Sequence, residues 1–392
     1  MSYLGMAEDE LRKRGGYWAA REIEHQPDLW RAIAASVRNH SDDVLSFLDA
    51  AKTSGVERVL LVGAGSSGMA AEIVVEHIRN LGGFPDVRCV RSTELVIRPD
   101  AYLDPDVPTL LVSMSSSGST PETVNCAREA KRRVRNLWHI IIVCVADGIL
   151  VQESKGDPQT LHIPLPPDTK GKSFAATAEF TCLVAQAMML FDCENIERYI
   201  DFFEGVAKEA KALFEAPFIH SVANDAGSAM VLLGSRELKT LAAEAALKAV
   251  EFTGGTYMSN FTSSLEFRHG PKLIMNSPVL AVFFAHPDPS VARYDLDMMT
   301  EVVGDQRPGK VACMSFGPLR EGDLEPDHYY EFERREIYAH APVAGCFLGA
   351  LAMQSFIELI SLEHGICADW PSEDRLVPKV ANRVTVYCEE VA

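Results

Sequence analysis

The chain has 392 residues and a net charge of −18, from 55 acidic and 37 basic side chains. This balance argues against a nucleic-acid partner, because phosphate backbones are bound by basic patches. The length allows two ordinary domains with a large core. We find no apolar run near twenty residues and no secretory signal, so no membrane partner is expected. The nine cysteines are irregularly spaced, which favours a reducing cytoplasm.

The first forty residues predict a helical arm that carries Trp30 as an aromatic anchor. Short apolar strands then alternate with helices. The strands are predicted at residues 58–63, 87–92, 109–114 and 139–146, with helices over 66–80 and after Pro121. This alternation predicts a parallel sheet that is covered by helices on both faces.

A polar helical connector is predicted over residues 195–216, and the same pattern then begins again. Its strands and final long helix are predicted at residues 230–234, 277–285, 309–316 and 344–365. The sequence therefore predicts a duplicated α/β fold, in which each parallel sheet is flanked by helices in a flavodoxin-like, Rossmann-type arrangement. We place the arm at 1–40, the two domains at 41–200 and 217–370, and a tail at 371–392.

The first strand ends in a glycine-rich turn with Gly63, Gly65 and Gly68 spaced as G-x-G-x-x-G. This spacing is typical of dinucleotide binding. A dinucleotide also requires an acidic residue at the end of the next strand to bind the ribose. Only Glu94 follows that strand, and it is misplaced for the role. Because any phosphate bound at a strand–loop–helix turn favours such glycines, the motif also fits a compact phosphate ester.

A second polar loop follows the third strand, where residues 113–120 hold five serines and a threonine. This is more hydroxyl groups than the N-cap of one helix needs. Such a loop offers hydroxyls, free N–H groups and a helix dipole to one anion. Ligands of open α/β sheets bind at the carboxyl ends of neighbouring strands. We therefore predict a phosphomonoester site here and no dinucleotide cofactor.

The loops GAGSS and SSSGST and the repeated lobe resemble the sugar isomerase (SIS) domain, present here in tandem. Residues 244–275 resemble the catalytic segment of the isomerase half of glucosamine-6-phosphate synthase. They resemble still more closely the family of galactosamine-6-phosphate deaminase/isomerases, also described as tagatose-6-phosphate ketose/aldose isomerases. The stretches REIEHQPDLW, RSTELVIRPDAYL, FRHGPK and ARYDLDMM agree with that family. The resemblance implies phosphate contacts at Ser66, Ser67, Ser115, Ser117 and Thr120.

Glu244, Lys248 and Glu251 are spaced i, i+4 and i+7, which places them on one face of a helix. Three such charges are often only a solvated stripe, but the residues between them are mostly apolar. A carboxylate in an apolar setting suits proton transfer between C2 and C1 of a sugar. The resemblance implies that Glu251 is this base, that Lys248 contacts the sugar or the carboxylates, and that Glu244 orients the lysine.

The resemblance also assigns His269, in FRHGPK, to opening the pyranose ring from the neighbouring subunit. An imidazole with an ordinary pKa near ~6.5 suits such proton transfer. The active site would then be complete only in a homodimer or a higher even oligomer. The other histidines are not spaced as metal ligands, so neither a metal nor another cofactor is expected.

Two differences from the synthase point to breakdown of an amino sugar. The chain has no room for a glutaminase domain, and alignment puts Asn382 where the synthase tail has its imine-forming lysine, with Lys379 nearby but out of register. The expected reaction converts galactosamine 6-phosphate, or glucosamine 6-phosphate, to the ketose phosphate and ammonia. Isomerisation of a neutral hexose 6-phosphate and deglycation of a fructosamine 6-phosphate stay open. A sensor of sugar phosphates is disfavoured, because the arm is too short for a DNA-binding domain.

Overall fold

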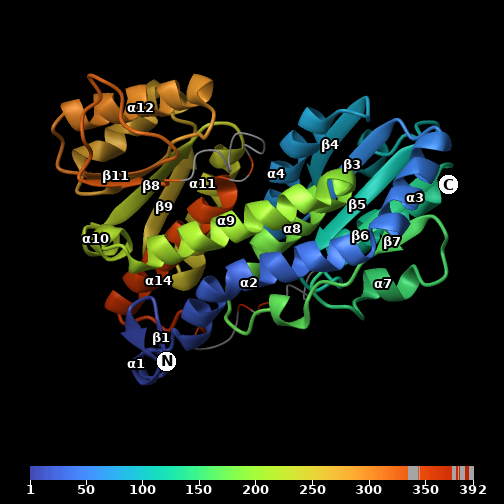
Figure 1. The fold of residues 1–392 in the computed structure, drawn as a ribbon, viewed down its shortest axis with the longest axis horizontal. Coiled ribbons are helices and arrows are strands. Elements are labelled where there is room, and N and C mark those ends of the chain that lie inside the picture. The colour runs from blue at the N-terminus through green and yellow to red at the C-terminus, as the bar shows by residue number, and fades with distance from the viewer. Residues whose placement is uncertain (334–342, 344, 373–376, 378, 380–384, 388–392) are drawn as a thin grey trace. The chain divides into compact units, whose positions relative to one another are not determined.

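The computed structural model describes residues 1–333, 343, 345–372, 377, 379 and 385–387. The chain divides into two compact units. Unit 1 comprises Met1–Pro27, Gly171–Thr177 and Phe202–Leu376, and unit 2 comprises Asp28–Lys170, Ala178–Asp201 and Val377–Ala392. Each unit contains a five-stranded parallel sheet with helices beside it (Figure 1). The predicted pair of parallel α/β sheets is therefore confirmed.

The sheet of unit 2 has the strand order β4-β3-β5-β6-β7. Its strands are β3 (Arg58–Gly63), β4 (Asp86–Arg91), β5 (Thr109–Ser115), β6 (Leu137–Val143) and β7 (Thr160–His162). Its helices are α3 (Ser41–Thr53), α4 (Gly65–Leu81), α5 (Ser92–Leu95), α6 (Pro121–Arg133), α7 (Ile149–Glu153) and α8 (Ala178–Phe191). The chain order 2-1-3-4-5 is that of a flavodoxin-like sheet.

The sheet of unit 1 repeats this topology in the order β12-β11-β10-β8-β9. Its strands are β8 (Ala229–Gly234), β9 (Met258–Thr262), β10 (Leu280–Phe284), β11 (Lys310–Ser315) and β12 (His328–Glu331). Its helices include α1 (Glu8–Arg14), α10 (Phe218–Asn224), α11 (Glu237–Phe252), α12 (Pro289–Gly304) and α14 (Gly345–Glu363), and a small hairpin joins β1 (Ser2–Tyr3) to β2 (Met6–Ala7). The unit boundaries at Pro27 and Asp201 fall within α2 (Tyr17–Asn39) and α9 (Ile196–Glu215).

The central strands of each sheet are buried on both faces, which explains their apolar runs. In β3, Leu60 and Val62 share a core cluster with Cys126 of α6. Leu61 points to the opposite face because side chains alternate along a strand. That side chain is also fully buried, on the side where α4 and α8 pack together. The edge strands β7, β9 and β12 were not predicted, because they are short and only partly buried.

Helix α14 corrects the expectation that no segment is apolar and long enough to cross a membrane. By length and composition its 19 residues could do so. All of its most apolar window is buried within unit 1, where α14 contacts α10 and α11. Such burial is typical of the central helix of a folded core, and its apolar character follows from that position.

The glycine-rich turn after β3 has a packing explanation. A Cβ atom on Gly63 would lie 2.7 Å from the carbonyl oxygen of Ser67, and one on Gly68 would lie 2.6 Å from the carbonyl oxygen of Gly63. Gly65 has a φ of +53°, a left-handed conformation that favours glycine. Two of the glycines therefore let α4 approach β3 closely, and the third makes the turn.

We expect Gly68→Ala to lower the free energy of unfolding by ~1–3 kcal/mol, because the added methyl group meets backbone atoms that cannot move aside easily. Gly304→Ala is the matched control. The nearest atom to its new Cβ is the end of the Leu324 side chain, at 3.4 Å. Urea unfolding of both variants measures the difference. Equal stability of the two variants would show that the close approach of α4 to β3 is not needed.

Candidate active site

Three hydroxyl groups of the predicted phosphate-binding set gather in the loop between β5 and α6. The Thr120 Oγ1 atom lies 3.4 Å from the Ser115 Oγ atom and 3.4 Å from the Ser117 Oγ atom. Thr120 is the N-cap residue of α6, yet its side chain makes no capping hydrogen bond. The Thr120 hydroxyl is therefore not used to cap the helix. The three hydroxyls lie close together at the start of α6, where the helix dipole favours binding of an anion.

The backbone of this loop is fixed by its own side chains. The Gly118 N–H donates to the Ser115 Oγ atom at 3.1 Å, and the Ser119 N–H donates to the Ser117 Oγ atom at 3.1 Å. The Ser119 hydroxyl accepts from the Ile149 N–H at the start of α7, also at 3.1 Å. The loop therefore holds its hydroxyls in place before any ligand arrives, which reduces the entropy lost on binding.

Ser66 and Ser67 are the second and third residues of α4, directly after β3. Strands β3 and β5 are hydrogen-bonded neighbours, and the strand order reverses between them. Ligands of open α/β sheets bind at such a position. Arg91, at the end of β4, donates to the Gly65 carbonyl at 3.1 Å and pairs with Glu72 at 2.6 Å. No pattern in the sequence predicts this contact.

The charged residues of α11 form one cluster, as their spacing predicted. The Lys248 Nζ atom lies 3.2 Å from the Glu244 Oε1 atom and also donates a hydrogen bond to Glu251. Burial favours the neutral amine, but the negative charges of Glu244 and Glu251 outweigh it and raise the pKa of Lys248 above its ordinary value. Lys248 therefore stays an ammonium group and cannot act as a base near neutral pH.

Exposure distinguishes the members of this cluster. The side chains of Glu244 and Lys248 are fully buried, whereas that of Glu251 is 26% exposed. Of the two carboxylates, Glu251 is the one that a ligand can reach. A partly open carboxylate beside a buried ammonium group is suited to accept and return a proton at one fixed position.

His269 is the last residue of the short 3₁₀ helix η4 (Glu266–His269), and a second one, η5 (Pro271–Asn276), begins two residues later. Phe267 anchors the segment in the core, and Lys272 pairs with Asp305 at 3.0 Å. The His269 side chain itself is exposed. Among the described contacts, none joins it to the Glu251–Lys248 cluster. Asn382, the residue that alignment puts at the imine-forming position, lies outside the described residues.

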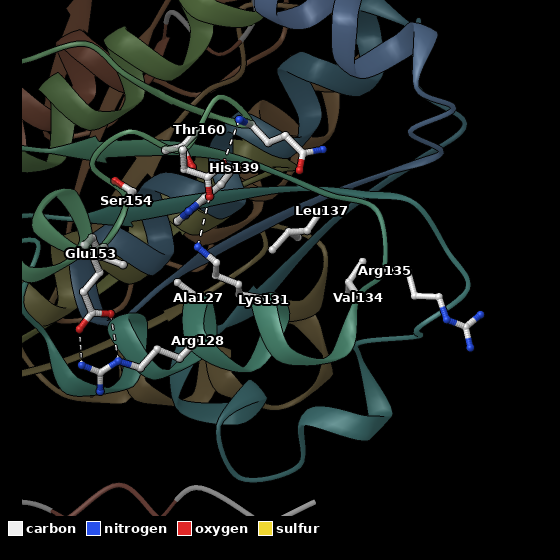
Figure 2. Close-up of a pocket in the computed structure, with 13 residues that line it drawn as sticks. Ala127, Arg128, Lys131, Val134, Arg135, Leu137, His139, Glu153, Ser154 and Thr160 are labelled. Carbon is white, nitrogen blue, oxygen red and sulfur yellow. Dashed lines mark hydrogen bonds and ion pairs between the residues drawn. The ribbon is translucent and has the colours of Figure 1, made fainter.

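Unit 2 also has a pocket of about 290 Å³ that contains none of the predicted site residues (Figure 2). It is lined by the later turns of α6, by α7 and by the first residues of β6 and β7. Two ion pairs lie within the pocket, since Arg128 binds Glu153 at 3.0 Å and Lys131 binds Asp157 at 3.2 Å. The serine loop lies at the other end of α6, so the pocket is separate from the candidate phosphate site.

Within the described ranges, no three His, Cys, Asp or Glu side chains are grouped to bind a metal ion.

The doubly wound fold and the hydroxyl-rich loop define a sugar-phosphate-binding class of protein, and the SIS domain family matches residues 54–191. The AgaS protein of Streptomyces coelicolor is 35% identical over 300 residues, which are 75% of this chain and 77% of its own length. D-galactosamine-6-phosphate deaminase AgaS of Escherichia coli O157:H7 is 30% identical over 382 residues, 95% of this chain and 96% of its own. The chain therefore belongs to the AgaS family of SIS-domain proteins.

A solved structure supports the same assignment. The crystal structure of tagatose-6-phosphate ketose/aldose isomerase from Escherichia coli matches with a TM-score of 0.84 and 27% identity, over 96% of this chain and 98% of that one. The near-complete coverage includes both α/β units. The resemblance inferred from the sequence motifs is thus confirmed at the level of family and fold.

Proposed function

We propose that this protein is an amino-sugar-phosphate deaminase/isomerase, which converts galactosamine 6-phosphate or glucosamine 6-phosphate to the ketose 6-phosphate and ammonia. The observation that carries the proposal is the cluster on α11, where a buried Lys248 ammonium holds a partly exposed Glu251 carboxylate. The near full-length similarity to a named D-galactosamine-6-phosphate deaminase supports the choice of substrate class.

Glu251 acts as the general base on the open-chain sugar. It removes the C2 proton, and the electron pair of that bond forms the C1–C2 double bond. At the same time the π bond of the C1 carbonyl opens onto O1, which takes up a proton from solvent, and the product is an enolamine. Return of the proton to C1, with loss of one N–H proton to solvent, gives an imine at C2. Water then adds to this carbon, and ammonia leaves to give the ketone. Lys248 holds the Glu251 carboxylate in position, and Glu244 balances the lysine charge inside the unit.

The phosphate group is bound by Ser66, Ser67, Ser115, Ser117 and Thr120. The clustering of the Ser115, Ser117 and Thr120 hydroxyls supports this assignment. The N-termini of α4 and α6, which follow neighbouring strands, add backbone N–H groups and the positive ends of two helix dipoles. No cofactor is part of the proposal, because proton transfer and hydrolysis need only an acid, a base and water.

Ser117→Ala and Thr120→Ala are each expected to raise KM for the sugar phosphate by about 10- to 150-fold, because a hydrogen bond to a charged group contributes about 1.5–3 kcal/mol. The value of kcat should change much less, since these groups lie away from the reacting carbons. Steady-state kinetics measures both quantities. Ser154→Ala, in the separate pocket, is the control. Normal KM values in both loop variants would place the phosphate elsewhere.

We also propose a homodimer, or a higher even oligomer, in which His269 acts on the substrate of the partner subunit. Exposed apolar side chains support this proposal. On α11, β9 and the following turn, Val250 is 44% exposed, Met258 67%, Phe261 41% and Leu265 44%. Strand β9 is also an edge strand with unpaired backbone groups. A second copy of the chain would cover these residues next to the segment that carries His269.

A second candidate is isomerisation of a neutral hexose 6-phosphate, which the similarity to a tagatose-6-phosphate ketose/aldose isomerase favours. The two reactions share the proton transfer and differ at the C2 substituent. Ammonia release from galactosamine and glucosamine 6-phosphates, measured beside isomerisation of neutral aldose 6-phosphates, separates them. If only a neutral aldose phosphate reacts, the deaminase proposal is wrong and the isomerase stands.

The free thiols support a reducing, cytoplasmic location. The eight cysteines among the described residues are all unpaired, and six of them are buried. Burial raises the pKa of Cys193 to about 11, so its thiolate is scarce at neutral pH. Buried thiols of this kind fill space in the core and do not contribute to the reaction.

A further inference from the structure

Lys170 brings a positive charge to the serine loop from a distant part of the sequence. Its Nζ atom donates to the Ser116 Oγ atom at 2.7 Å, across a separation of 54 residues. Ser116 lies between Ser115 and Ser117, two of the residues assigned to the phosphate. The side chain of Lys170 is 27% exposed, so it is not sealed in the core.

A buried carboxylate holds this amine beside the loop. Glu179, the second residue of α8, has a side chain only 1% exposed and lies 3.3 Å from the Lys170 Nζ atom. The Lys379 Nζ atom lies 3.4 Å from the same carboxylate oxygen. Burial opposes ionisation of Glu179, but the charges of Lys379 and Lys170 outweigh it and hold the pKa of Glu179 below its ordinary value. The Glu179 carboxylate therefore holds the Lys170 amine in place beside the serine loop.

This arrangement supplies what the hydroxyls lack. Serine and threonine side chains donate hydrogen bonds to a phosphate, but they do not neutralise its negative charge. A chain with a net charge of −18 also repels anions at long range, so the compensating cation has to be local. A lysine ammonium has three N–H donors. The contacts of Lys170 to Ser116 and Glu179 use two of them, and the third is available to a phosphate oxygen.

We propose that Lys170 binds the substrate phosphate at the serine loop, as its direct positively charged partner. This inference rests on the proposed function, since it concerns the phosphate of the same sugar substrate. It adds a residue from outside both polar loops to the phosphate site. The alternative is that Lys170 and Glu179 form only a structural ion pair, which would make no difference to anion affinity.

The test compares Lys170→Met and Lys170→Arg with Lys172→Met. Lys172 is a suitable control because it lies two residues further on and its amine stacks on the Trp18 ring, 4.0 Å from the centroid. Titration calorimetry with inorganic phosphate measures affinity without turnover. We expect Lys170→Met to weaken phosphate binding by about 10- to 150-fold. Lys170→Arg should retain most of the affinity, and Lys172→Met all of it. The KM for the sugar phosphate should rise in parallel, with little change in kcat.

Chemical labelling of the wild-type protein gives a second measurement that does not depend on how the variants fold. Acetylation of lysine amines, followed by mass spectrometry, should be slowed at Lys170 by saturating inorganic phosphate and unchanged at Lys172. Wild-type phosphate affinity in a folded Lys170→Met, or no protection of Lys170, overturns the inference. Ammonia release tests the enzyme separately. If the wild type releases ammonia but Lys170 does not affect phosphate binding, only this inference fails. If phosphate binding requires Lys170 but no amino sugar reacts, the anion site stands and the proposed function fails.

Discussion

Glu251→Gln is expected to lower kcat for ammonia release by about 10²–10⁴-fold, the usual loss when a general base is removed. Glutamine has nearly the shape of glutamate but cannot take the C2 proton. The substitution is on α11, so the affinity of the serine loop for inorganic phosphate should not change. Steady-state ammonia release measures kcat, and titration with inorganic phosphate measures the affinity of the serine loop.

The control for this experiment is Glu215→Gln, since the Glu215 side chain is 70% exposed at the end of α9. It should retain wild-type turnover. In deuterated water the wild-type enzyme should also place deuterium at C1 of the ketose, unless the proton is returned without exchange. Turnover within a few-fold of wild type in Glu251→Gln would remove this residue from the mechanism.

Mixing two inactive variants is expected to restore activity if the active site is shared between subunits. His269→Asn and Glu251→Gln should each be nearly inactive as pure proteins. After subunit exchange, half of the dimers are mixed, and each mixed dimer has one site with both native residues. The mixture should therefore reach about a quarter of wild-type activity.

Exchange has to be demonstrated independently, for example by mass spectrometry of differently tagged subunits. The control is a mixture of Glu251→Gln with Glu251→Ala, which contains no intact site in any combination. Activity of the first mixture no higher than that of the control, despite complete exchange, would rule out a site that uses His269 from the partner. A monomer in sedimentation experiments would rule out the assembly itself.

The local pattern of apolar and polar residues was sufficient to predict the strands and helices that surround the candidate site. Strands β3 and β5 are continuous apolar runs because both faces of their sheet are covered, and this burial can be read from neighbouring residues alone. The common face of Glu244, Lys248 and Glu251 follows from the helical period in the same way. The predicted boundaries at residues 40, 200, 217 and 370 stay a prediction.

Features that depend on contacts between distant segments could not be predicted from local sequence pattern. Strand β9 was missed because an edge strand with an exposed face has no apolar run. The complete burial of Lys248 was also not evident, since three charges at helical spacing are compatible with an exposed stripe.

The sequence by itself determined the family, the duplicated α/β fold and the hydroxyl-rich loop, because each depends on residues close together in the chain. Only the tertiary structure decided that Gly63 and Gly68 serve helix packing, that Glu251 is the open carboxylate of its cluster, and that Lys170 contacts Ser116. These depend on how the chain turns back on itself. Lys170 and Ser116 are 54 residues apart, and no helical or strand period relates positions at that distance. Their contact is therefore known only from the folded chain.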